Sequence, residues 1–185
     1  ANVPLPGLVM TWQVPHASHP DAAPLAVVAT LLAEGESSRL NERLVRGEIA
    51  QEIYADADMR RDLGVFLAFA VMGSDREPKA AEAGIRAELE DLAKKGPSQS
   101  ELQKAKNLIL TSALRERETS NGKAFSLGEA ILIYGNAAVA NNGLTLVQNV
   151  TPADVQRVVK QYLTGSKPVV IEYFDQSRRP AGGEK

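Results

Sequence analysis

The sequence predicts an α+β protein in which a mixed or antiparallel sheet packs against a layer of helices. Two neighbouring stretches alternate apolar and polar residues or are apolar throughout, which is typical of strands. In other stretches apolar residues recur at intervals of three and four, the period of a helix. The predicted order is one strand, two helices, a hairpin, several helices and a last strand. This order differs from the regular strand–helix alternation of a doubly wound nucleotide-binding fold.

The predicted elements begin with a strand at residues 8–14, which ends at a proline. A helix is expected from Ala22 to the glycine at position 35, since apolar residues follow the helical period there. A second helix should begin at Ser37 and Ser38, because a serine hydroxyl can accept hydrogen bonds from the free amides of a first turn. We expect that helix to end at Gly47.

Residues 49–72 are expected to form a hairpin at the centre of the sheet. Residues 49–59 alternate in polarity, which predicts a strand with one dry and one wet face. Glycine and charged residues at 60–64 supply the turn. The segment 65–72 is almost entirely apolar, which predicts a strand that is covered on both faces.

The remaining chain is predicted to be mostly helical. Gly96 and Pro97 should end one helix, and Ser98 with Glu101 fits a capping box that opens the next. Thr151 before a proline and an acid is also a strong helix start. An Asn/Gly-rich loop is expected at 135–143. The expected segments are helices at 78–95, 98–118, 123–134 and 151–163, and a closing strand at 169–174.

The length of 185 residues and the 44% hydrophobic composition predict a single domain with its own core. We place this domain at 1–176 and a polar tail at 177–185. The chain begins without a methionine or a signal segment, which favours a piece of a longer protein.

Composition disfavours several classes of function. The net charge of −2 supplies no basic surface for nucleic acid. The absence of cysteine excludes a disulfide framework, a thiolate nucleophile and a cysteine-ligated zinc, and leaves the compartment open. The longest apolar runs are far shorter than the ~20 residues of a membrane span, so no span is expected.

Histidine and carboxylates are the metal ligands available to this chain. A hydrolytic zinc site needs histidines at converging spacings, such as H-E-x-x-H or H-x-x-E-H, and neither motif is present. The two histidines, His16 and His19, lie beside Asp21 in a predicted loop. Histidine next to proline and aspartate is usual in turns, so we expect no metal site there.

Other catalytic patterns are equally weak. Ser120 and Lys123 satisfy S-x-x-K, but the companion S-D-N and K-T-G motifs are missing and the segment is better explained as a helix break. No phosphate-binding glycine loop is present. The carboxylate pairs lie on polar faces of amphipathic elements, where solvated surface is the default interpretation; they are Asp56 with Asp58, and Glu88 with Asp91. We therefore expect no catalytic, cofactor-binding or metal-binding residue in this chain.

Four segments, in the right order, resemble the second-domain signature of the pitrilysin/insulysin zinc-peptidase family, which includes the mitochondrial processing peptidase. The helix at 100–107 is similar to the family's t-x-x-E-L-x-x-A-K pattern, and 150–158 is similar to V-T-x-x-D-V-x-x-v. The segments that carry the resemblance are 31–45, 49–50 with 62–66, 100–107 and 150–158, and the similarity extends over about 6–174.

The resemblance implies that the chain is one half of a clam-like peptidase. In this family the catalytic zinc is held by H-x-x-E-H and a distal Glu in the first half, and the second half carries no metal. The implied partners are the zinc-bearing N-terminal domain of the same polypeptide, a second family subunit and a peptide substrate. Export to the periplasm is favoured over the cytoplasm by the resemblance alone.

Many second-type domains supply an Arg and, seven residues later, a Tyr that contact the substrate backbone. In this sequence those positions hold Val45 and Glu52. Arg46 and Tyr54 are near, but a shift of one residue turns a helical side chain by about 100 degrees, so we do not transfer the roles to them. The variant resembles second domains that are fused behind a zinc-bearing first domain, which implies the C-terminal domain of a metal-bearing bacterial subunit.

Two other interpretations stay open. The parent protein could be a scaffold that has lost proteolysis, as in core subunits of respiratory complexes that resemble this family. The chain could also be a stand-alone hydrolase that uses Ser120 and Lys123, or His16 and His19. An intact H-x-x-E-H upstream in the reading frame favours the peptidase, a degenerate motif the scaffold, and no upstream domain the hydrolase.

Overall fold

The computed structural model describes residues 5–173, so the expected tail at 177–185 and the end of the last predicted strand at Phe174 lie outside the described residues. None of the helices in 5–173 is long and apolar enough to cross a membrane. The elements are β1 (Gly7–Val14), α1 (Ala22–Ala33), the π-helical turn η1 (Asn41–Val45), β2 (Ala50–Met59), β3 (Gly64–Met72), α2 (Pro78–Lys95), α3 (Gln99–Glu116), α4 (Ser120–Tyr134), α5 (Val139–Asn149), α6 (Pro152–Val158), the π-helical segment η2 (Val159–Thr164) and β4 (Val169–Tyr173).

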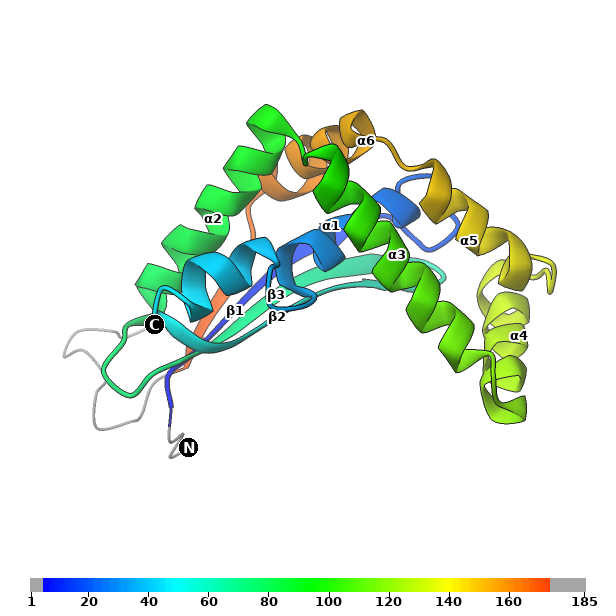
Figure 1. The fold of residues 1–185 in the computed structure, drawn as a ribbon, viewed down its shortest axis with the longest axis horizontal. Coiled ribbons are helices and arrows are strands. Elements are labelled where there is room, and N and C mark those ends of the chain that lie inside the picture. The colour runs from blue at the N-terminus through cyan, green and yellow to red at the C-terminus, as the bar shows by residue number, and fades with distance from the viewer. Residues whose placement is uncertain (1–4, 174–185) are drawn as a thin grey trace.

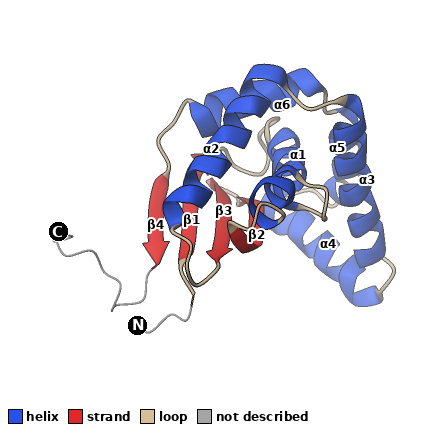
Figure 2. Ribbon diagram, turned by 60° about the vertical axis from the view of Figure 1, so that its left-hand side comes forward, coloured by secondary structure: helices blue, strands red, loops and turns tan. Residues whose placement is uncertain are grey.

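The four strands form one antiparallel sheet in the order β2-β3-β1-β4. β2 and β3 are the predicted hairpin, but the expectation that it lies at the centre of the sheet was wrong, since β2 is an edge strand. The last strand of the described chain pairs with the first, so that Leu8 lies opposite Glu172. Helices and sheet form separate layers (Figures 1 and 2), which confirms the predicted α+β class and decides that the sheet is antiparallel throughout.

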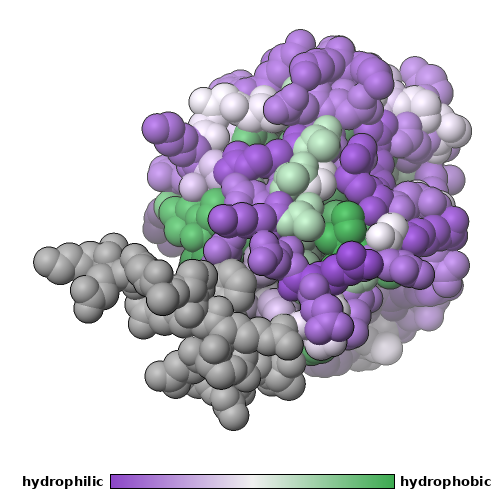
Figure 3. Space-filling model, turned by 90° about the vertical axis from the view of Figure 1, so that its left-hand side faces the viewer, coloured by the Kyte–Doolittle hydropathy of each residue, from purple (hydrophilic) through white to green (hydrophobic). Residues whose placement is uncertain are grey.

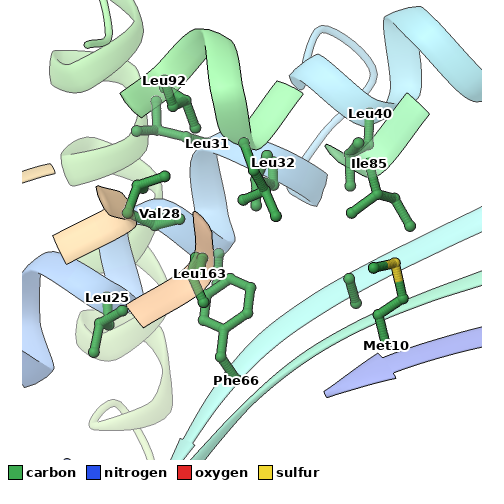
Figure 4. Packing of buried hydrophobic residues seen from close by; sticks show 14 of the residues in the cluster. Met10, Leu25, Val28, Leu31, Leu32, Leu40, Phe66, Ile85, Leu92 and Leu163 are labelled. Carbon is green, nitrogen blue, oxygen red and sulfur yellow. The ribbon is translucent and has the colours of Figure 1, made fainter. Parts of the chain in front are cut away.

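The core lies between one face of the sheet and the helices. α1 packs on β2, α2 packs on β1 and β3, and η2 packs on β1. Met10 and Phe66 point from the sheet toward Leu25, Ile85 and Leu163 of the helical layer (Figure 4). None of these five side chains is more than 2% exposed. The contact between the sheet and the helical layer therefore supplies most of the apolar burial that stabilises the fold.

The opposite face of the sheet is open, and here the prediction for β3 was wrong. Buried and partly exposed residues alternate along β3, and Val65 is 39% exposed. The continuous apolar run therefore does not mark a strand with helices on both sides. Along β2 the expected alternation is confirmed, since Ile53 packs against the core and Tyr54 is 51% exposed.

Several helix ends form as the sequence predicts. The hydroxyl of Ser98 accepts from the amide of Glu101, whose carboxylate accepts from the amide of Ser98 at 2.8 Å, so the capping box at α3 is complete. Thr151 and Asp154 form the same arrangement at α6. α2 ends at Gly96, whose φ of 71 lies in the region that favours glycine.

The expected serine cap of the second helix does not form. The hydroxyl of Ser37 accepts from Lys104 on α3, and the hydroxyl of Ser38 is buried without a hydrogen-bond partner among the described residues. The turn instead closes through the backbone, where the amide of Glu42 donates to the carbonyl of Ser38. A tertiary contact with α3 thus takes one of the two hydroxyls away from the helix end.

The predicted loop at 135–143 is wrong in its second half, because α5 begins at Val139. Gly143 and the neighbouring asparagines lower the intrinsic helix propensity. α5 nevertheless packs against α1 and α3, and Val147 is buried in the core. Burial of this apolar side chain outweighs the poor local propensity, which is a common tertiary effect.

Candidate functional site

The candidate functional site is the open face of the sheet, the side that faces away from the core. The register places Tyr54, Phe69, Val9 and Ile171 in one row across the four strands. Tyr54 is 51% exposed and Ile171 is 43% exposed at the two ends of this row. The side chains on the open face are Val9, Thr11 and Gln13 of β1, Glu52, Tyr54, Asp56 and Asp58 of β2, Val65, Leu67, Phe69 and Val71 of β3, and Val169, Ile171 and Tyr173 of β4.

An apolar surface of this kind is unusual for a protein that stays free in water, and it marks a contact surface. The end of the molecule at which α2 lies is different, because hydrophilic side chains dominate there and apolar ones form small separate patches (Figure 3). Unlike that end, the open face carries a run of neighbouring apolar side chains. Exposed apolar side chains also lie on α4, where Phe125 and Leu132 are each 74% exposed.

The charge on the strands is of one sign. The four strands contain Glu52, Asp56, Asp58 and Glu172 and no lysine or arginine. Asp58 pairs with Arg60 at 2.7 Å, whereas no basic side chain in 5–173 pairs with Glu52 or Asp56. Burial, together with the neighbouring carboxylates of Asp56 and Asp58, raises the pKa of the Tyr54 phenol.

The histidine pair belongs to a structural cluster. The rings of His16 and His19 meet edge to face at 5.9 Å, and Nδ1 of His19 accepts from the amide of Asp21 at 3.1 Å. The carboxylate of Asp21, which is only 4% exposed, accepts from Arg157 at 2.5 and 3.0 Å and from the hydroxyl of Tyr162 at 2.8 Å.

These contacts tie the loop before α1 to α6 and η2. The hydrogen bond from Arg157 lowers the pKa of Asp21 despite its burial. Asp21 is therefore an ionised partner of a fixed cation, with its oxygens already engaged. It does not combine with His16 and His19 as a ligand set, and no group of three or more potential ligands in 5–173 fits a metal ion. A catalytic zinc does not fit this part of the chain.

Ser120 and Lys123 lie at the start of α4 as exposed residues, and no hydrogen bond joins them within 5–173. The hydroxyl of Thr119 caps the helix by accepting from the amide of Gly122 at 3.0 Å. A break between the two helices is present as predicted, but it lies at residues 117–119, and residues 120–122, where the break was expected, form the first turn of α4. The S-x-x-K pattern thus coincides with a helix start and shows no serine–lysine contact.

The assignment of Glu88 and Asp91 to solvated surface was wrong for Glu88, which is 8% exposed. Glu88 pairs with Arg43 and, at 3.5 Å, with Arg39. Arg39 also contacts Asp91 at 3.0 Å and Glu101 at 2.8 Å, so one guanidinium links the segment before η1 to α2 and α3. This network explains the acidic pair structurally, and it was missed because its members lie far apart in the sequence.

The two family substrate-contact positions are Val45, at the end of η1, and Glu52, on the open face. Tyr54 lies on the same face as Glu52, as the strand period requires. Arg46 is exposed and pairs with Glu42 at 2.9 Å. The structure therefore places Tyr54 on the same face as Glu52, and no arginine within 5–173 forms a hydrogen bond or ion pair with Tyr54 or Glu52.

A groove of about 510 Å³ lies between α1 and α3. Its lining includes Thr30 and Ser112. Glu34, Arg115 and Glu116 give the groove both signs of charge. It contains no histidine and no cysteine, so it offers no familiar pairing of a nucleophile with a base. The open face of the sheet is the stronger candidate.

Comparison with known proteins agrees with the family resemblance. The model of the family described as the peptidase M16 inactive domain matches residues 1–109. No curated protein matches the chain. A solved inactive peptidase domain of a proposed zinc protease from Bordetella parapertussis is 26% identical with a TM-score of 0.84, and the match covers 94% of this chain and 92% of that one.

Two further structures are similar. A proposed zinc protease from Bordetella pertussis Tohama I is 28% identical with a TM-score of 0.82, over 92% of this chain and 94% of that one. A protease from Helicobacter pylori has a TM-score of 0.85 at 24% identity, over 92% of this chain and 41% of that one. The chain therefore spans about two fifths of the Helicobacter pylori protease chain.

Proposed function

The chain belongs to the family described as the peptidase M16 inactive domain, and from this premise we propose that it is the non-catalytic C-terminal domain of a bacterial zinc metallopeptidase. In the parent enzyme its open face forms part of the wall of the peptide-binding chamber. Other parts of its surface contact the zinc-bearing N-terminal domain and a second subunit of the same family.

The observation that carries this proposal is the open face of the sheet. Its apolar side chains are exposed or half-buried, its β2 edge is acidic, and none of the catalytic patterns from the sequence is assembled on it. Such a surface can bind an extended peptide through apolar contacts but has no group to activate water. The zinc of the parent enzyme would supply that chemistry from the N-terminal domain. This chain would bind and orient the peptide.

The reading frame that encodes the chain provides a direct test. We expect an intact H-x-x-E-H motif in a domain encoded upstream of residue 1. Co-expression of that domain with this chain should give cleavage of a quenched fluorescent peptide, and each domain alone should give none. A degenerate upstream motif would overturn the proposal in favour of the scaffold interpretation, and activity of the upstream domain alone would remove the need for this chain.

The isolated chain is expected to bind no stoichiometric zinc and to cleave no peptide. The reason is that Asp21 is engaged with Arg157 and Tyr162, while Ser120 and Lys123 make no mutual contact. Elemental analysis and a peptidase assay check both points. A chelator should leave the melting temperature unchanged, because no coordination energy supports the fold. One zinc per chain, or activity that disappears in Ser120→Ala, would contradict this expectation.

A further inference from the structure

We propose that the open face selects extended peptide segments in which a basic side chain adjoins apolar ones. The basic group would lie at the acidic corner, which we define as Glu52, Tyr54 and Asp56 of β2. The apolar side chains would lie along the row that leads from Tyr54 to Ile171. This inference rests on the proposed function, since it names the class of peptide that the chamber wall prefers.

The apolar row has the dimensions of a short extended segment. Neighbouring strands lie about 4.7–4.9 Å apart, so the four strands from Tyr54 to Ile171 span roughly 14 Å. At about 3.3 Å per residue this is the length of about four extended residues. Phe69 and Val9 lie between the two ends, and neither row end carries a charge. A peptide that crosses the strands would therefore meet apolar surface for about four residues before it reaches the β2 edge.

The carboxylates at the β2 edge favour a peptide with a positively charged side chain. Arg60 neutralises Asp58, which leaves Glu52 and Asp56 as the uncompensated carboxylates beside the exposed Tyr54 ring. A lysine or arginine placed there would gain charge-assisted hydrogen bonds and a contact with the face of the ring. A glutamate in the same place would be repelled by both carboxylates. Because no strand residue is basic, the discrimination has one sign over the whole face.

The grooves elsewhere on the described surface lack this property. The groove between α3 and α4, about 500 Å³ in volume, is lined by Arg115 and Arg117 as well as Glu116 and Glu129. The groove between α1 and α3 also carries both signs of charge. A basic peptide therefore has no reason to prefer these grooves over the acidic corner.

The test uses the chain with two probe peptides. Each is ten residues long and alternates leucine with serine, and they differ only in a central arginine or glutamate. In nuclear magnetic resonance titrations of the ¹⁵N-labelled chain, we expect the arginine peptide to bind about tenfold more tightly at low salt, a difference of about 1.4 kcal/mol. The shifted signals should belong to residues of β1, β2, β3 and β4. The preference should weaken near 1 M salt, where the Debye length falls to ~3 Å.

Matched variants locate the selectivity. The double variant Glu52→Gln/Asp56→Asn should reduce the tenfold preference to less than about twofold, because it removes the two uncompensated carboxylates. The control Glu116→Gln/Glu118→Gln makes the same change of net charge at the exposed end of α3 and should keep the preference. Circular dichroism would show that both variants fold.

The outcomes separate the two proposals. Equal binding of both peptides to the strands would overturn the charge selection and leave the proposed chamber wall standing. Binding of neither peptide, or shifts confined to α4 and α5, would overturn both. Sedimentation could instead show a dimer, with the amides of the four strands protected from hydrogen exchange in both copies. That result would identify a second copy as the occupant and would also overturn the inference.

Discussion

Replacement of Arg39 by leucine is expected to lower the free energy of unfolding by about 3 kcal/mol, at the lower end of the range for breaking a buried ion pair. The side chain of Arg39 is 16% exposed and contacts Glu88, Asp91 and Glu101. Its loss leaves Glu88, which is 8% exposed, with Arg43 as its one remaining cationic partner within 5–173. For a chain of this size the melting temperature should fall by roughly 6–12 °C, which calorimetry or thermal circular dichroism would measure.

Two further variants test the cause of this loss. Arg86→Leu removes an ion pair with Glu82 on the surface of α2 and should leave the melting temperature nearly unchanged. Adding Glu88→Gln to Arg39→Leu should recover part of the stability, because it removes a buried charge that has lost one of its two cationic partners among the described residues. If the double variant loses as much free energy of unfolding as the two single variants together, the loss in Arg39→Leu does not arise from the buried charge of Glu88.

The second large effect is expected for Asp21→Asn, with a loss of about 2–3 kcal/mol at pH 7. The carboxylate of Asp21 is 4% exposed and accepts three hydrogen bonds, two of them from the guanidinium of Arg157. An asparagine side chain keeps the shape but loses the charge, and it turns an amide donor toward Arg157 or Tyr162. Urea unfolding at constant temperature would measure the difference.

The pH dependence of this variant follows from the pKa of Asp21. The hydrogen bond from Arg157 lowers that pKa in the folded state, so the carboxylate binds its proton more weakly when the protein is folded. Its contribution is therefore complete above the unfolded value of about 3.9 and disappears as pH falls through the lower folded value. The stability difference between the wild type and Asp21→Asn should be constant from pH 7 to 5 and shrink below about pH 4.

An exposed carboxylate serves as the control for this experiment. Glu90 pairs with Lys94 at 2.8 Å on the surface of α2. Glu90→Gln should show no measurable change in the free energy of unfolding at pH 7 or below pH 4. A difference for Asp21→Asn that persists undiminished at pH 2 would show that the ionised carboxylate is not the source of the effect.

Local sequence signals predicted the elements of this fold wherever an element begins or ends through contacts between residues that are close in the sequence. The box of Ser98 with Glu101, the glycine at 96 and the proline after Thr151 act within a few residues, and α2, α3 and α6 begin or end where they predict. Alternation along β2 predicted its two faces. The four ordered segments also identified the family, which the family model supports.

The tertiary structure changed the assignments that depend on distant partners. α5 forms through its contacts with α1 and α3 despite Gly143, and the hydroxyl of Ser37 bonds to Lys104 instead of capping a helix. Glu88 is buried and pairs with Arg43 of η1 and with Arg39, which lies just before η1. None of these pairings has a local signature, since the partners are tens of residues apart.

The sequence by itself determined that β3 is apolar on both sides, and only the tertiary structure decided that no described helix buries its second side. Periodicity reports how polar each face of a strand is, but the same apolar run satisfies a covered strand and an open one. What covers a face depends on where the chain places its helices, and here the apolar side chains that helices contribute to the core lie on the other side of the sheet. The open face, and with it the candidate site, is therefore a property of the assembled layers.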